Sequence, residues 1–300
     1  MNRLPNFLVV GAAKSGTTAL YHYLAQHPEV FLSPIKETNF FALKNKELSF
    51  NGPGDDKGIH RRSITDIIEY KNQFINVTTE KAIGEICPSY LYLKDAPKNI
   101  KEHIPEVKII AILREPVARA FSAWVHLTRD GREHLSFEEA LADEPRRIKE
   151  NWAEIWHYKE ESKYYNQLKR YYDSFPKENI KVVTYEEFQE NPLKVYSELC
   201  KFIDVDNRFV PDMSSEHNKG GIPKNKIIWN LMMKQNIWKT LFNHLMPIKI
   251  RKKIKEKIEA RNVNKKPQLD IYRRKELSIQ FLDEINKIKQ LIEQDLTEWS

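Results

Sequence analysis

The amino-acid sequence predicts an α/β fold of three layers, with a central parallel β-sheet flanked by helices on both faces. Short apolar runs alternate along the chain with segments of helical periodicity, and most of these runs are rich in Val and Ile and nearly unbroken. Such runs are typical of strands that are covered on both faces. The chain has 300 residues, of which 41% are hydrophobic and 30% charged, so it can bury a sizeable core and has an ordinary globular composition.

Four strands and three neighbouring helices follow from these patterns. The strands are expected at residues 7–10, 81–85, 107–113 and 180–184. Helices are expected at 18–27 and 116–128, after the first and third strands, and at 162–175, before the fourth. This alternation of strand and helix favours parallel pairing, because parallel strands need a crossover connection between them.

Two further segments complete the predicted organisation. The stretch NGPGDDKG, residues 51–58, is rich in turn-forming residues and is expected to be an exposed loop. The C-terminal region, about residues 225–300, is predicted to be helical, and its end keeps apolar residues at helical spacing: Leu282, Ile285, Ile288, Leu291, Ile292 and Leu296. Because such a stripe packs against a core, residues 1–300 are expected to form a single domain.

The positive charge of the chain is concentrated in one region. The net charge is +7, and residues 249–275 hold twelve Lys or Arg against three Asp or Glu, which gives this segment +9 and leaves −2 for the rest. A basic segment attracts anionic membranes or polyanionic substrates, or is simply a solvated helical face. No nucleic-acid partner is expected.

The cysteines and the apolar runs bear on the compartment. Cys87 and Cys200 are too few for a disulfide framework and lack the spacing of metal ligands. The sequence has no run of 18 apolar residues and no cleavable signal pattern at its start. These features predict a cytoplasmic protein.

The segment GAAKSGTTAL after the first predicted strand has the composition of a phosphate-binding loop. Gly11 and Gly16 allow a tight turn and a close approach to a ligand, and the following helix offers unpaired N–H groups to an anion. A lysine and three hydroxyl residues add donors: Lys14, Ser15, Thr17 and Thr18. The loop is P-loop-like, but its lysine precedes the second glycine, whereas in nucleotide triphosphatases the lysine follows it.

A second anion-binding group stands at the end of the third predicted strand. Arg114 leaves the carboxyl end of that strand, which is the edge where open α/β sheets bind ligands. Ser122 lies eight residues later, in the following helix, where it can share an anion with Arg114, whereas Arg119 is expected at the surface. A nucleotide triphosphatase offers an acidic residue for magnesium at the comparable strand end. The pattern therefore predicts two separated anionic groups held without a metal.

Five segments together resemble a known family. They are GAAKSGTTAL, HPEVFLSPIKETNFF, GEICPSYLY, LREPVARAFSAW and VVTYEEFQENP, and they occur in order between about residues 7 and 224. They resemble the sulfotransferases that use 3′-phosphoadenosine-5′-phosphosulfate (PAPS), and most of all the bacterial and heparan-modifying branch. The resemblance implies a P-loop-like fold, PAPS as the sulfonate donor and 3′-phosphoadenosine-5′-phosphate (PAP) as the product.

The resemblance also implies which residues hold the donor. The 5′-phosphosulfate would be gripped by Lys14, Ser15, Gly16, Thr17 and Thr18, and the 3′-phosphate by Arg114 and Ser122. Tyr185 matches a position near the adenine, or else is an aromatic residue of the core. Lys219 and Gly220, in EHNKGGIPK, match a loop that covers the 3′-phosphate.

For the catalytic step, the resemblance implies that Lys14 stabilises the leaving phosphate oxygen and that Glu37 acts as general base. Phe40 and Phe41 follow Glu37 and could desolvate it, which would favour a base working near neutral pH. The alternative interpretation of Glu37 is a surface or capping acid. The chain departs from glycan-modifying relatives at Ile86 and Cys87, where a lysine is frequent, and Lys36 is either a substitute for it or an exposed lysine.

The acceptor is expected to be a carbohydrate or glycolipid, because Glu37 matches the base of glycan sulfotransferases. Residues 38–80, 125–165 and the basic region would form its surface. Five aromatic residues either line a groove or pack in the core: Trp152, Trp156, Tyr158, Tyr164 and Tyr165.

Two other classes of function remain open from the sequence. A nucleotide or small-molecule kinase needs magnesium ligands that the strand ends do not offer. A non-catalytic polyanion-binding protein would use residues 249–275.

Overall fold

The computed structural model describes residues 4–214 and 267–299. Its centre is a five-stranded sheet with strand order β2-β3-β1-β4-β5, and all four pairings are parallel. The strands are β1 (Phe7–Gly11), β2 (Val30–Leu32), β3 (Ala82–Ile86), β4 (Lys108–Leu113) and β5 (Ile180–Thr184). The predicted parallel sheet is therefore confirmed.

Alternate residues of the strands supply two hydrophobic cores, one on each face of the sheet. In β1, Phe7 and Val9 belong to one core, whereas Leu8 and Val10 belong to the other. This alternation follows from the two-residue period of a strand. Gly84 in β3 pairs with Phe7, and a Cβ atom at Gly84 would lie 2.1 Å from the phenyl ring, so this crossing accepts only glycine.

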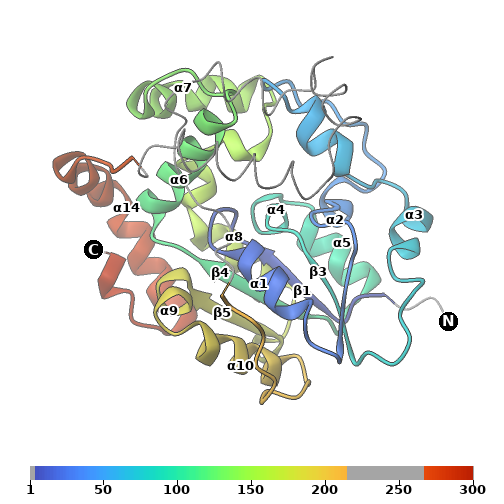
Figure 1. Cartoon of the computed structure of the whole chain (residues 1–300). Coiled ribbons are helices and arrows are strands. Elements are labelled where there is room, and N and C mark those ends of the chain that lie inside the picture. Colours follow the sequence, from blue (N-terminus) through green and yellow to red (C-terminus); the bar gives the residue numbers. More distant parts are fainter. Residues whose placement is uncertain (1–3, 215–266, 300) are drawn as a thin grey trace, which may run out of the picture.

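The smaller core is covered by helices α1 (Thr17–Leu24), α9 (Tyr185–Glu190) and α10 (Pro192–Phe202). The larger core is covered by α4 (Ser89–Tyr92), α5 (Ala96–His103), α6 (Pro116–Arg129), α8 (Tyr164–Tyr172) and α14 (Ile271–Ile292). The expected helical layers on both faces are thus confirmed. Figure 1 shows α7 (Phe137–Lys149) at the top of the view, on the far side of α6 from the sheet.

The remaining elements are short. They are α2 (Phe40–Leu43), the π-helical turn η1 (Asp56–His60), α3 (Ile67–Asn72), η2 (Glu154–Trp156), η3 (Glu160–Ser162), η4 (Lys177–Asn179) and η5 (Thr297–Trp299). No helix in residues 4–214 or 267–299 is long and apolar enough to cross a membrane.

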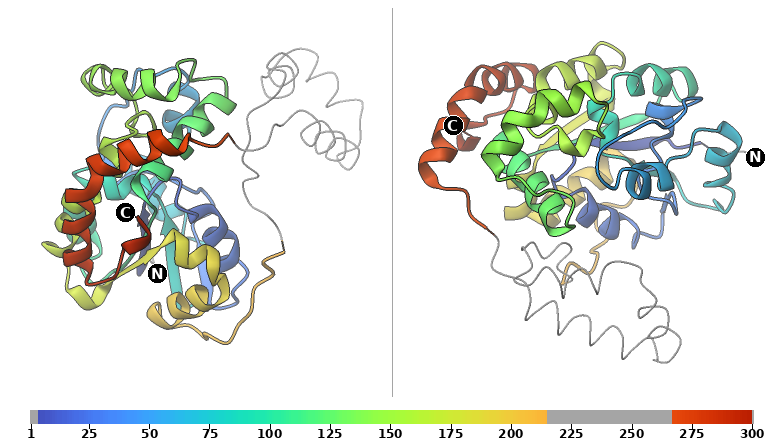
Figure 2. Two further views of the ribbon diagram at one scale, coloured as in Figure 1. Left: turned by 90° about the vertical axis from the view of Figure 1, so that its left-hand side faces the viewer. Right: turned by 90° about the horizontal axis from the view of Figure 1, so that it is seen from above.

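The last described segment packs back onto the body of the protein. Figure 2 shows α14, in red, along the outside of the molecule, where it contacts α8 and α6. Ile285 and Ile288 of the expected apolar stripe are buried in the larger core, together with Phe281, whereas Leu282 of that stripe is 41% exposed. Residues 215–266, which hold Lys219, Gly220 and most of the basic segment 249–275, lie outside the described residues.

Two predictions at the level of elements were wrong. The short strand β2 was missed, because a run of three residues, VFL, gives too little periodicity to be recognised. The stretch 51–58 is not simply an exposed loop, since Asp55 within it is 1% exposed and accepts hydrogen bonds from Gly52 N, Ala153 N and the Trp156 indole. Composition identified the turns, but it could not reveal these partners about a hundred residues away.

Candidate active site

All five strands end at one edge of the sheet, and the segment after each of them reaches the same pocket. These segments contribute Lys14 after β1, Glu37 after β2, Ser89 after β3, Arg114 after β4 and Tyr185 after β5. The pocket has a volume of about 1070 Å³. Parallel strands point their carboxyl ends the same way, which is why residues so distant in sequence meet here.

The loop after β1 turns sharply into α1. Lys14 has a φ of 71° and Gly16 a φ of 87°, both left-handed, and Gly16 caps α1 with no side-chain hydrogen bond. The first N–H groups of α1 therefore have no side-chain cap in the described residues, and Thr17 and Thr18 beside them line the pocket. Ser15 is fully buried, and its side chain is not part of the pocket wall.

Arg114 is held in place by two contacts. Its Nη1 donates to the backbone oxygen of Lys14 at 3.1 Å, and its guanidinium stacks 4.6 Å from the centre of the Tyr185 ring. The same ring packs on Gly16, where a Cβ atom would lie 3.1 Å from it. Tyr185 thus fixes the relative position of the first loop and Arg114, and all three line the pocket.

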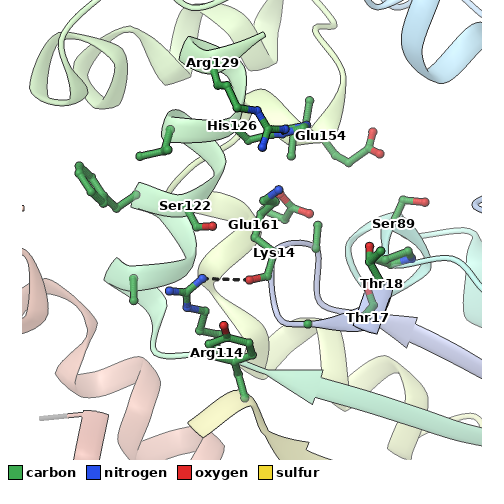
Figure 3. Close-up of a pocket in the computed structure, with 18 of the residues that line it drawn as sticks. Lys14, Thr17, Thr18, Ser89, Arg114, Ser122, His126, Arg129, Glu154 and Glu161 are labelled. Atoms are coloured by element: carbon green, nitrogen blue, oxygen red, sulfur yellow. Dashed lines mark hydrogen bonds between the residues drawn. The ribbon is translucent and has the colours of Figure 1, made fainter. Parts of the chain in front are cut away.

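Helix α6 begins two residues after Arg114 and carries Ser122 into the pocket. The helix starts at Pro116, and the Glu115 carboxylate caps it by accepting from Val117 N and Ala118 N, both at 2.8 Å. Arg274 of α14 forms an ion pair with Glu115 at 3.3 Å and also lines the pocket. Arg114 and Ser122 are therefore brought to the same wall, and Figure 3 shows Arg114 at its lower end.

Lys14 lies between the two ends of the pocket (Figure 3). Burial lowers its pKa from 10.5 to about 8, and the positive charges of Arg129 and Arg114 lower it further, against the opposing charges of Asp130 and Glu37. Its ammonium group makes no hydrogen bond or ion pair with residues of the described part of the chain. A partly buried cation without a partner among the described residues is a favourable site for an anion.

Glu37 occupies a tightly fixed turn after β2. Its φ is 65°, its N–H donates to Ile86 O at 3.1 Å, and the next residue, Thr38, donates its hydroxyl to the buried carboxylate of Glu85 at 2.5 Å. The turn is thus tied to β3 on both sides of Glu37. This arrangement distinguishes Glu37 from a freely moving surface acid.

The charges around Glu37 favour its ionised form. Burial acts to raise the pKa of Glu37, but the neighbouring charges of Lys36 and Arg62 outweigh it and hold that pKa below its usual value. Lys36 forms an ion pair with Glu37, and Arg62 reaches the other carboxylate oxygen at 3.3 Å. Lys36 is therefore a partner of Glu37 and not a freely exposed lysine.

Two residues of α6 line the pocket although the sequence did not predict them as part of the site. His126 and Arg129 line the upper end of the pocket in Figure 3. Burial, followed by the charges of Lys14 and Arg129, keeps the pKa of His126 far below its usual value, so its imidazole is neutral. The signal for these residues was present, because Ser122, His126 and Arg129 follow at helical spacing and share one face of a helix that had been predicted.

Arg119 was predicted at the surface, and this prediction was wrong. The side chain is fully buried, and it donates to Ser162 Oγ at 2.6 Å and to Glu161 Oε2 at 2.5 Å. The segment containing η3 covers this turn of α6, a long-range contact that helical periodicity alone does not predict. Glu161 and Glu154, from this segment and η2, also line the pocket and were not anticipated.

The aromatic residues between 152 and 165 do not form a groove. Trp156, Tyr158 and Tyr164 are at most 1% exposed and belong to the larger core, against which Trp152 and Tyr165 pack. The packing interpretation is therefore the correct one. Cys87 is likewise buried, and burial raises the pKa of its thiol well above the usual value.

Residues 4–214 and 267–299 contain no group of three or more His, Cys, Asp or Glu side chains placed to hold a metal ion.

Two comparisons with known proteins match most of the chain. A family model described as "Sulfotransferase family" matches residues 5–209. The crystal structure of a sulfotransferase from Alicyclobacillus acidocaldarius is 34% identical, covers 99% of both chains and superposes with a TM-score of 0.78.

Two curated relatives match over part of their length. The human bifunctional heparan sulfate N-deacetylase/N-sulfotransferase 3 is 30% identical over 216 residues, which are 68% of this chain and 23% of the relative. The membrane-associated sulfotransferase kil1 of Dictyostelium discoideum is 27% identical over 147 residues, 47% of this chain and 28% of the relative. The chain thus spans about a quarter of the length of these relatives.

Proposed function

Because this chain belongs to the sulfotransferase family, we propose that it transfers a sulfonate group from PAPS to a hydroxyl or amine of a carbohydrate or glycolipid. The observation that carries the proposal is the meeting of Lys14, the start of α1 and Arg114 in one pocket. All three groups can donate hydrogen bonds, and Lys14 and Arg114 also carry positive charge. They come from two different loops, and PAPS has two phosphate positions to be held.

The residues present fit such a donor. Lys14, Gly16, Thr17 and Thr18 would hold the 5′-phosphosulfate, since the unpaired ammonium of Lys14 and the uncapped N–H groups of α1 both favour an anion. Arg114 and Ser122 would hold the 3′-phosphate, and a guanidinium matches phosphate oxygens in shape as well as charge. Tyr185 would support the adenine end. Ser15, which is buried and donates its N–H to Ala12 O at 3.2 Å, would shape the loop and not contact the sulfonate donor. Lys219 and Gly220 stay predictions, because they lie outside the described residues.

In the chemical step the protein must remove a proton from the acceptor and stabilise the charge on the leaving phosphate oxygen. PAPS supplies a sulfonate attached to a phosphate leaving group, and transfer is an in-line displacement at sulfur. Glu37 is proposed to take the proton from the attacking hydroxyl or amine; its lowered pKa keeps it ionised near neutral pH but makes it a weaker base than the desolvated carboxylate that the sequence favoured. Lys14 is proposed to stabilise the charge that grows on the leaving phosphate oxygen.

A carbohydrate acceptor is supported by the similarity to the heparan sulfate N-deacetylase/N-sulfotransferase, whose name states such a substrate. The pocket wall is rich in charged side chains, which suits a sugar better than an apolar ring; besides Lys14 and Arg114 it holds Asp55, Arg62, Arg129, Arg132 and Glu154. A glycolipid is the second kind of carbohydrate acceptor that we propose, because one relative is a membrane-associated sulfotransferase.

The test of the donor is calorimetric titration with PAP in the presence of a chelator. We expect wild type to bind PAP with about micromolar affinity and Arg114→Ala to bind at least about tenfold more weakly, because a charge-assisted contact is lost. Arg208→Ala is the matched control, since Arg208 carries the same charge, is exposed and does not line this pocket. Failure of folded wild type to bind PAP would refute the proposal, and titration with magnesium and ATP would then test a kinase.

Three further expectations from the sequence are also proposals. A single domain over residues 1–300 is favoured by the packing of α14 on α8 and α6. Contact of residues 249–275 with an anionic membrane or substrate can be tested by deleting the segment and measuring binding to anionic vesicles. A cytoplasmic location can be tested by fractionating cells.

A further inference from the structure

Two carboxyl groups in the pocket wall have oxygens without any hydrogen-bond partner. Glu154 is 9% exposed and Glu161 1% exposed, and both line the pocket. Glu154 Oε2 and Glu161 Oε1 are buried and accept no hydrogen bond from any described residue. Figure 3 shows Glu154 near Arg129 at the upper end of the pocket and Glu161 near Lys14.

Among the buried carboxyl groups of the described residues, Glu154 and Glu161 alone have an oxygen without a partner; the seven other buried polar side-chain atoms that lack one carry no carboxylate charge. The other buried glutamates all have partners: Glu85 accepts from Thr38, Tyr70 and Tyr90, Glu115 and Glu144 each accept from two backbone N–H groups, and Glu133 accepts from Arg147 and Tyr158. Because burying an unpaired polar atom is unfavourable, the protein satisfies its carboxylates everywhere else. The exceptions at Glu154 and Glu161 therefore indicate a partner that is not part of the described chain.

The two groups differ in how far they are already satisfied. Glu161 Oε2 accepts from the buried Arg119, so only its second oxygen is open. Glu154 has no side-chain partner in the described residues, and burial, followed by the charge of Glu161, raises its pKa to about 7. Glu154 is thus the more open of the two and the better position for a test.

We propose that Glu154 and Glu161 bind hydroxyl or amine groups of the acceptor other than the group that is sulfonated, and so select a sugar over a phenol. This inference rests on the proposed sulfotransferase function. A phenol has a single O–H group, which must face the base Glu37 in order to react. A sugar has additional O–H groups that can donate hydrogen bonds to Glu154 and Glu161. A phenol in the pocket leaves both carboxylate oxygens unpaired, and a site built to receive a hydrogen bond rejects a ligand that lacks the donor.

The test compares two acceptors and three variants. The acceptors are a panel of glucosamine-containing oligosaccharides and 4-nitrophenol, and the readouts are kcat/KM, the Kd for PAP and the thermal unfolding midpoint. Glu154→Leu removes both oxygens at similar volume, and Glu154→Gln keeps one of them. Glu160→Leu is the matched control, because Glu160 is near in sequence, is paired with Lys163 and does not line the pocket.

We expect Glu154→Leu to lower kcat/KM for the sugars by about 10- to 100-fold and to leave the Kd for PAP within about twofold, whereas kcat/KM for 4-nitrophenol should stay the same or rise, because the oxygens that a phenol leaves unpaired are gone. Glu154→Gln should recover part of the loss. The unfolding midpoint of Glu154→Leu should stay the same or rise, since an unpaired buried carboxylate is removed, whereas a structural role predicts a fall. Glu160→Leu should leave the sugar-to-phenol ratio unchanged.

Three outcomes would overturn the inference. The first is wild type that binds PAP but sulfonates no sugar of the panel, or prefers 4-nitrophenol. The second is Glu154→Leu with an unchanged sugar-to-phenol ratio, which would mean that water alone meets these oxygens. The third is a lower unfolding midpoint with parallel losses for both acceptors. Failure of the proposed function itself is recognised separately, because wild type would then not bind PAP.

Discussion

The depressed pKa of Lys14 makes donor binding dependent on pH in a way that can be measured. Burial and the nearby arginines lower this pKa to about 8 in the free protein. An anion bound against the ammonium favours its charged form, so the pKa rises in the complex and PAP binding draws a proton onto Lys14. The phosphate groups of PAP have their second pKa near about 6 and contribute little above pH 7.5.

The size of the effect follows from the pKa. With a value of about 8, Lys14 is about 90% protonated at pH 7, half protonated at pH 8 and about 10% protonated at pH 9. Proton uptake on binding should therefore be about 0.1, 0.5 and 0.9 at these pH values, provided that the complex is fully protonated. Affinity is full below the free pKa and falls as pH rises through it, by about tenfold from pH 7 to pH 9, or about 1.4 kcal/mol.

The assay is calorimetry of PAP binding in buffers with different enthalpies of ionisation. The slope of the observed enthalpy against buffer enthalpy gives the number of protons taken up. Lys14→Arg is the control, because arginine stays charged over the whole range, so its affinity should be nearly independent of pH and its uptake near zero at pH 8. Equal proton uptake by wild type and Lys14→Arg would refute the assignment of this pKa to Lys14.

Two further perturbations test the base and the sheet. Arg62→Ala removes a cation from Glu37, so the pKa of that carboxyl should rise and the acid limb of the kcat/KM profile should move about half a unit to higher pH, whereas Arg61→Ala should not move it. An unmoved limb in Arg62→Ala would argue against Glu37 as the base. Gly84→Ala drives a methyl group into the phenyl ring on β1 and should lower the free energy of unfolding by about 1–3 kcal/mol in urea titrations. Gly58→Ala, which meets only one atom at 3.8 Å, is the control, and equal stability of the two variants would contradict the packing argument.

The sequence placed Lys14, Arg114 and Tyr185 at one edge of the sheet, where the structure brings them into one pocket, for a local reason. Lys14, Arg114 and Tyr185 each follow directly after a strand, and parallel strands bring their ends to one edge whatever the rest of the chain does. Short-range patterns were therefore sufficient for them. Ser15 shows the limit of such reasoning, because composition does not tell which residues of a tight loop turn their side chains inward.

The acidic residues of the pocket wall that come from loops and short turns, Asp55, Glu154 and Glu161, could not be predicted in the same way. Asp55 is held by Trp156 and Ala153, and Glu161 by Arg119, through contacts across 42 to 101 positions of sequence. Nothing in the local pattern of these segments distinguishes a buried carboxylate from one on a surface turn. His126 and Arg129 are an intermediate case, since the helical spacing from Ser122 was visible but was not followed up the helix.

The choice of lysine at position 14 also has a physical reason. The pocket gathers Arg62, Arg114 and Arg129 around this position, and a permanently charged side chain among them would be repelled in the absence of a ligand. Burial, followed by this repulsion, lowers the pKa of Lys14 to about 8, so the lysine is mostly charged at pH 7 but can lose its proton above pH 8 and regain it when an anion arrives. Arginine cannot, so Lys14→Arg keeps the added repulsion in the free protein. The proton that Lys14 takes up when an anion binds is therefore the measurable difference between the lysine of this chain and an arginine at the same position.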